Sequence, residues 1–131
     1  MPTKTEPTFV HDFMAWEAEM GYCREPRIFR HAVGSTTSFS PGLVCEVSSG
    51  KMIPVATDAN AAGILLDEVK DLATATDKPN VMFLVRGPAM VVGAKLNVNG
   101  GVLSAQLAAL AALNVPILSK SLPVKTTTMG A

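Results

Sequence analysis

The apolar positions of this chain follow one period near its start and a different one over most of the remainder. In residues 9–20, large apolar side chains recur every three or four positions, which is the spacing of one face of a helix. These positions are Phe9, Phe13, Trp16 and Met20. We predict a short amphipathic helix that ends near Gly21, because glycine commonly stops a helix. A helix this short is marginal alone, so its apolar face must dock on something.

From residue 27 onward, short apolar runs separated by turn residues predict a series of β-strands. The predicted strands are 27–30, 43–47, 52–55, 63–66, 81–85, 89–92 and 115–118. Ser48-Ser49-Gly50-Lys51 joins the second and third runs, which predicts a hairpin. Pro54 cannot donate a ladder hydrogen bond, so its strand should lie at an edge or be irregular there. The continuous apolar run at 81–85 indicates a strand that is buried on both faces, or one whose outer face a subunit covers.

The segments between these strands are predicted connections, with one helix in the second half of the chain. A turn is expected at 40–42, one helical turn at most at 57–61, and a polar loop at 67–79. Ser104 is predicted to cap a helix that runs to about Asn114. Its predicted buried stripe is Leu103, Leu107, Leu110 and Leu113. The fold class that follows is mainly β with minor α content (α+β).

The 131 residues suffice for one domain with its own core and are few for two. Residues 1–20 are interpreted as an N-terminal arm that includes the short amphipathic segment. Residues 21–118 form the predicted β-rich domain, and residues 119–131 a loose C-terminal tail. Six of the seven aromatic residues precede residue 40. They either pack within their own domain or anchor a neighbouring subunit or partner, since aromatic residues are enriched at interface hot spots.

Composition and charge exclude several classes of partner. Hydrophobic residues make up 48% of the chain and charged residues 17%, which is typical of a globular protein. Basic and acidic residues number 11 each, so no charge footprint for nucleic acid or anionic lipid is present. No stretch approaches the roughly 20 apolar residues of a membrane span. The first residues lack an apolar signal-peptide core, so we expect synthesis in the cytoplasm. Cys23 and Cys45 are interpreted as small hydrophobes, with a disulfide between them as the alternative.

The sequence contains no strong catalytic or metal-binding motif. His11 and His31 are far apart, without neighbours at ligand spacing. Asp67, Glu68 and Asp71 form a carboxylate cluster that is typical of a solvated loop. We predict no catalytic residue, no metal and no cofactor, and therefore no enzyme.

Arg86 is the one charged residue set against an apolar strand. We interpret it as a structural residue, in a salt bridge or hydrogen bond between chains, with contact to an anionic ligand as the alternative.

Five segments, in order, resemble elements of the lambda-type head decoration proteins of tailed phages. They are YCREPRIF at 22–29, SFSPGLVCEVSSGKMIPV at 38–55, AAGILLDEV at 61–69, VMFLVRGPAMV at 81–91 and LSAQLAALAALNVPIL at 103–118. Their order and spacing agree over about residues 10–118, although each element alone is a weak signal. The chain departs from the family pattern at Cys23, where serine is usual, at Pro116 in the closing strand, and in its tail after residue 118.

The resemblance implies a small barrel-like or tulip-like β-rich domain with one helix in its C-terminal half and an extended N-terminal arm. It implies a homotrimer on the outer surface of the virion head, bound to the major capsid protein at three-fold and quasi-three-fold sites. There it would act as a cement protein that stabilises the capsid against DNA pressure, without contacting nucleic acid, membrane or a small-molecule substrate. The capsid-interface candidates are then Thr3, Thr5, Thr8, Phe9, Phe13, Trp16 and Tyr22, and the trimer-interface candidates are Phe83, Arg86, Pro88 and Met90.

Two alternatives remain open from sequence. One is a small trimeric β-domain enzyme or ligand-binding protein with an inter-subunit site, in which Arg86 would contact an anion. The other is a different virion module, such as a head-fibre base or tail-associated protein, on the same fold.

Overall fold

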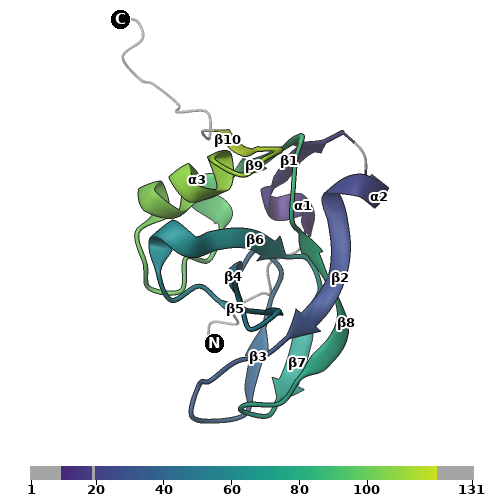
Figure 1. Ribbon diagram of the computed structural model, residues 1–131, viewed down its shortest axis with the longest axis vertical. Coiled ribbons are helices and arrows are strands. Elements are labelled where there is room, and N and C mark those ends of the chain that lie inside the picture. Colours follow the sequence, from purple (N-terminus) through teal and green to yellow (C-terminus); the bar gives the residue numbers. More distant parts are fainter. Residues whose placement is uncertain (1–9, 19, 121–131) are drawn as a thin grey trace, which may run out of the picture.

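The computed structural model of the protein describes residues 10–18 and 20–120, in which the chain is mainly β with minor α content, as the sequence predicts (Figure 1). The strands are β1 (Met14–Glu17), β2 (Arg24–Phe29), β3 (Thr37–Phe39), β4 (Val44–Ser48), β5 (Lys51–Pro54), β6 (Ala61–Leu65), β7 (Val69–Leu72), β8 (Lys78–Leu84), β9 (Ala89–Val92) and β10 (Ile117–Lys120). The helices are the single turns α1 (Val10–Phe13) and α2 (Met20–Cys23) and the longer α3 (Leu103–Ala111), with 3-10 turns at Asp58–Asn60 and Gly93–Lys95.

Five of these strands close a barrel in the order β2-β5-β4-β6-β8. The predicted hairpin is confirmed, since β5 pairs antiparallel with β4 over its whole length. Ser49 and Gly50 connect the two strands with φ angles of 51° and 77°, the left-handed geometry that a tight hairpin turn requires. The barrel closes at a single parallel pair, Phe29↔Met52, between β2 and β5. Pro54 lies beyond this pair, so the pairing of β5 with β2 stops before the residue that lacks an N–H.

A three-stranded sheet, in the order β1-β9-β10, lies with α3 at one end of the barrel (Figure 1). The chain passes from β8 to β9 through a cis peptide bond between Gly87 and Pro88. The N–H of Gly87 donates to the carbonyl oxygen of Val115 at 2.7 Å. A Cβ atom at Gly87 would lie 1.8 Å from the carbonyl oxygen of Pro116, so only glycine fits where this corner meets the approach to β10.

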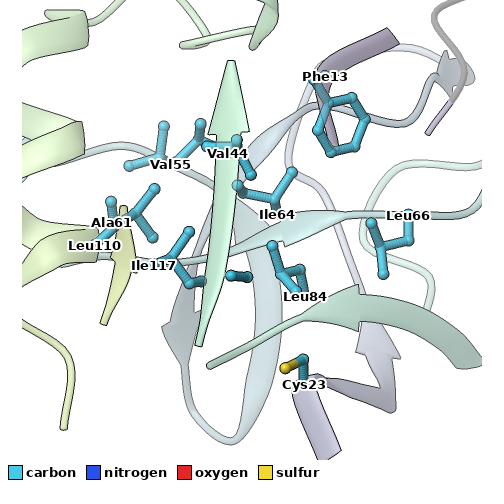
Figure 2. Packing of buried hydrophobic residues seen from close by; sticks show 12 residues of the cluster. Phe13, Cys23, Val44, Val55, Ala61, Ile64, Leu66, Leu84, Leu110 and Ile117 are labelled. Carbon is cyan, nitrogen blue, oxygen red and sulfur yellow. The ribbon is translucent and has the colours of Figure 1, made fainter. Parts of the chain in front are cut away.

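Alternate residues of the barrel strands supply two separate hydrophobic clusters. The first lies between the barrel, α3 and the three-stranded sheet (Figure 2), and consists of Phe13, Cys23, Val44, Val55, Ala61, Ile64, Leu66, Leu84, Ala89, Val91, Leu110 and Ile117. The second draws residues from all five barrel strands, and consists of Phe29, Leu43, Cys45, Met52, Leu65, Val69, Leu72, Val81, Phe83 and Val85. The apolar run at 81–85 is therefore buried on both faces within one chain, as one of the two sequence-based interpretations requires.

The structure corrects the helix predicted over residues 9–20. The described part of that stretch forms one helical turn, α1, and then the strand β1, which pairs antiparallel with β9. Gly21 is not a helix stop but lies within α2. Long-range pairing with β9 thus overrides the local helical spacing of the apolar residues. Because residues 10–18 are part of the folded body, the predicted boundary at residue 20 does not coincide with a break in the fold.

The loop predicted at 67–79 contains the strand β7, which pairs antiparallel with β3. Val69 and Leu72 are its buried residues, and their spacing of three hides the alternation expected of a strand. Asp71 has a φ of 49°, and the register of the pair shifts between Thr37 and Phe39, so the strand is irregular where its pattern breaks.

The predicted cap and stripe of α3 also need correction. The helix begins at Leu103, and the Asp58 carboxylate accepts the N–H of Val102 at 3.2 Å, whereas Ser104 lies inside the first turn. Gln106 and Leu110 are its fully buried residues. The other three leucines of the predicted stripe, Leu103, Leu107 and Leu113, are half-buried. The amide nitrogen of buried Gln106 donates to Asp58 and to the carbonyl oxygen of Val98, both at 2.9 Å, which offsets the desolvation of that nitrogen.

Candidate interaction surface

The structure divides the sequence-predicted interface residues into three groups. Thr3, Thr5, Thr8 and Phe9 lie outside the described residues. Phe13 and Phe83 are fully buried, in the first and the second hydrophobic cluster respectively. Their side chains pack inside their own domain, which corrects their assignment to a capsid or trimer surface. The remaining five residues, Trp16, Tyr22, Arg86, Pro88 and Met90, reach the surface.

Three large apolar side chains form a row across the three-stranded sheet. Met90 of β9 lies opposite Trp16 of β1 and opposite Leu118 of β10. Residues that are directly opposite on neighbouring strands place their side chains on the same face. Trp16 is 55% exposed and Leu118 47%, while Met90 between them is half-buried. We refer to Trp16, Met90 and Leu118 as the apolar row.

The opposite face of the same sheet belongs to the core. Ala89, Val91 and Ile117 alternate with the residues of the row and are all buried in the first cluster. A sheet that packs one face on its own domain normally presents polar residues on the other. This sheet instead presents tryptophan, methionine and leucine side by side, so the row is a candidate contact surface.

Arg86 connects this sheet to the segment that carries Tyr22. One guanidinium nitrogen, Nη1, donates to the carbonyl oxygen of Tyr22 at 2.5 Å, and Nη2 donates to Oε1 of Glu25 at 2.9 Å. The guanidinium carbon lies 5.2 Å from the centroid of the Tyr22 ring, within the range of a cation–π contact. The pKa of Glu25 is held below its ordinary value by this hydrogen bond to Arg86 and, secondarily, by Arg27. Arg86 thus makes its contacts within one chain, and its predicted inter-chain bond stays a prediction.

Further contacts tie the N-terminal segment to the corner at Pro88. The carbonyl oxygen of Pro88 accepts the N–H of Ala18 at 2.9 Å and lies 3.6 Å from the Cys23 thiol. The N–H of Val85 in turn donates to the carbonyl oxygen of Cys23 at 3.0 Å. The exposed residues predicted for two separate interfaces therefore lie in one continuous region, which no local pattern in the sequence could have shown.

Leu118 is the residue of this region that sequence reasoning missed. It lies in a segment correctly predicted as extended, and the residue before it, Ile117, is buried. The alternation of a strand places the neighbour of a buried residue on the opposite face. This alternation predicts that Leu118 is exposed, but it could not indicate that Leu118 lies beside Met90 and Trp16.

The described residues contain no group of three histidine, cysteine or acidic side chains that could hold a metal ion. His31 is fully buried, accepts the N–H of Val33 at its Nδ1, and pairs through Nε2 with the carbonyl oxygen of Leu72 at 2.7 Å. Cys23 and Cys45 are free and buried, and burial raises the pKa of the Cys45 thiol. The two cysteines fit their sequence-based interpretation as small hydrophobes, and both ring nitrogens of His31 have hydrogen-bond partners within the chain.

Asp67, Glu68 and Asp71 are exposed, as expected of a solvated cluster. Asp67 also has a structural role, since its carboxylate accepts the N–H of Met82 at 2.8 Å. In the described part of the chain, no helix is both long and apolar enough to span a membrane.

Comparison with family models, with curated proteins and with solved structures finds no match to this chain. The resemblance to head decoration proteins therefore rests on the five ordered sequence segments alone.

Proposed function

We propose that this protein is a structural virion protein, a homotrimeric decoration protein that binds the outer surface of a tailed-phage head. Its sites are the three-fold and quasi-three-fold positions of the major capsid protein lattice, where it stabilises the shell against the pressure of packaged DNA. The apolar row carries the proposal, because three large apolar side chains that adjoin on one sheet face form a surface suited to contact with a protein. The five resembling segments support a major capsid protein as that partner.

The row is suited to contact because it is presented rigidly. Trp16, Met90 and Leu118 stand on hydrogen-bonded strands whose other face is packed in the core, so little conformational entropy is lost when a partner covers them. Burying the exposed parts of these side chains contributes about 25 cal/mol per Å² of apolar surface. Three copies of the row on one trimer raise the effective concentration of each binding contact, so three contacts of modest affinity together give tight binding.

Arg86 and Tyr22 supply a polar edge beside the row. The guanidinium and the phenol ring combine planar apolar area with hydrogen-bonding groups, the composition enriched at interface hot spots. The net charge of zero adds no long-range repulsion between copies or between protein and shell. Cement function of this kind involves no turnover, cofactor or small-molecule substrate.

The direct test compares how tightly the wild-type protein and a variant without the apolar row bind to purified phage heads. The double variant Trp16→Ala, Leu118→Ala should lower head binding at least tenfold in a sedimentation assay while leaving the circular dichroism spectrum unchanged. Val47→Ala is the matched control, because Val47 is also an apolar strand residue and is 49% exposed, but it lies on β4 of the barrel. Full head binding by the double variant would contradict the use of this surface.

Deletion of residues 1–9 tests the predicted arm separately. Deleting residues 1–20 would be uninformative, because it removes the buried Phe13 and the strand β1 and so disrupts the fold itself. Electron microscopy of heads with bound protein distinguishes a decoration protein from a head-fibre base or tail-associated module, since these differ in position on the particle.

A further inference from the structure

A groove on the barrel is separate from the surface described above. It has a volume of about 710 Å³ and lies between residues 30–33, which follow β2, and the β4–β5 hairpin. Apolar side chains, Val33, Ile53 and Pro54 among them, form part of its lining, together with the two cationic residues Arg30 and Lys51. This combination of apolar walls and a few converging polar groups is typical of small-molecule sites.

The walls of the groove are fixed by hydrogen bonds. The N–H of Arg30 donates to the carbonyl oxygen of Met52 at 3.0 Å, which joins one wall to the hairpin. His31 accepts the N–H of Val33 at Nδ1, so Nε2 carries the proton and donates to the carbonyl oxygen of Leu72. The backbone carbonyl oxygen of His31 accepts the N–H of Ala75 at 2.9 Å. The groove is thus formed before any ligand arrives, which lowers the entropic cost of binding.

The charges at the groove are unbalanced in favour of an anion. Arg30 and Lys51 are its charged lining residues, and both pair with the one carboxylate of Asp77, at 2.9 Å and 2.8 Å. Lys51 and, secondarily, Arg30 hold the pKa of Asp77 below its ordinary value, so this carboxylate is ionised near neutral pH. Two positive charges facing one negative charge leave a local excess of one positive charge.

We propose that this groove binds a small amphipathic organic anion. The apolar body of the ligand lies against Val33, Ile53 and Pro54, and its single carboxylate or sulfonate accepts hydrogen bonds from Arg30 and Lys51 beside Asp77. Polyanions such as nucleic acids are excluded, because two partly neutralised cations beside apolar walls offer few phosphate contacts. The site lies within one chain and does not involve Arg86, so it is independent of the proposed virion function.

The probe for this test is 8-anilinonaphthalene-1-sulfonate, compared with its uncharged analogue N-phenyl-1-naphthylamine. Lys51→Gln and Arg30→Gln should each weaken sulfonate binding about tenfold, the effect of losing one charge-assisted hydrogen bond, and change binding of the uncharged analogue less than twofold. Ala56→Trp, which places a large side chain at the groove lining, should abolish binding of both dyes. Fluorescence titration measures each dissociation constant.

Matched controls separate this site from general dye binding. Lys70→Gln removes an exposed cation outside the groove, and Ala108→Trp adds the same bulk to an exposed position of α3. Neither control should change either dissociation constant, and the amide NMR shifts caused by the sulfonate should centre on Val33, Ser49 and Ala56. The proposal is overturned by the absence of sulfonate binding, by unchanged binding in both charge variants, or by shifts that centre on the apolar row.

Discussion

The apolar run 81–85, in β8 and the residue after it, and the apolar strand β9 lie on either side of Gly87-Pro88, and they have different roles. In β8 and the residue after it, Val81, Phe83, Leu84 and Val85 are buried by the chain itself, because β8 sits between two hydrophobic clusters. In β9, Ala89 and Val91 are buried while Met90 reaches the surface. An apolar strand therefore indicates an interface only where the domain leaves one of its faces uncovered.

The largest expected effect on stability comes from a substitution in β8. Phe83→Ala should lower the free energy of unfolding by about 3–5 kcal/mol, because it leaves a cavity beside Phe29 in the centre of the barrel. Urea denaturation monitored by circular dichroism measures the loss. A loss below about 1 kcal/mol would mean that Phe83 is not a core residue.

A substitution at Gly87, in the corner between β8 and β9, should cause the next largest loss of stability. Gly87→Ala places a Cβ atom 1.8 Å from the carbonyl oxygen of Pro116, so backbone on one side must move. We expect a loss of about 2–3 kcal/mol in the free energy of unfolding. Gly34→Ala is the control, because no atom lies within 4 Å of its Cβ position and its melting temperature should hardly change.

Arg86 should show a smaller effect that depends on pH. Arg86→Gln removes the ion pair with Glu25 and the contact with the Tyr22 ring, at a cost of about 1 kcal/mol near neutral pH, because the pair is partly exposed and screened. A lowered folded-state pKa of Glu25 stabilises the fold above the unfolded-state pKa, and this contribution disappears as the pH falls through the folded-state pKa.

The stability difference between the wild type and Arg86→Gln should therefore shrink as the solution is acidified. Urea denaturation of both proteins over a pH series measures it, and a difference that is constant with pH would count against the Glu25 pairing.

The smallest effect on stability is expected on the β9 side. Met90→Ala should cost less than about 1 kcal/mol, because half-buried surface residues contribute little to the core. A loss as large as that of Phe83→Ala, in the same denaturation experiment, would mean that Met90 contributes to the core as much as Phe83 does.

Local signals in the sequence predicted the parts of the fold that depend on neighbours in the chain. The hairpin at β4–β5 follows from Ser49-Gly50 between two apolar runs, and β6, β8 and β9 follow from apolar runs between turns. The strand β1 could not be predicted in this way, because its formation depends on pairing with Met90 and its neighbours far along the chain. For the same reason, Trp16 and Met90 were both predicted as surface residues but for different interfaces.

Burial within α3 was misjudged for a related reason. A leucine stripe is the natural expectation, yet Gln106 is buried because Asp58 and Val98, from outside the helix, accept its hydrogen bonds. Partners brought together by the fold decide whether a polar side chain enters the core.

The three-stranded sheet is assembled from β1, near the beginning of the described chain, and from β9 and β10, in its last third. During synthesis, Trp16 leaves the ribosome well before Met90, and Leu118 leaves it last. A chain that ends before β10 therefore cannot display the complete row, since Leu118 is missing. Under the proposed function, a phage head that binds this surface would select subunits whose chain is complete through β10.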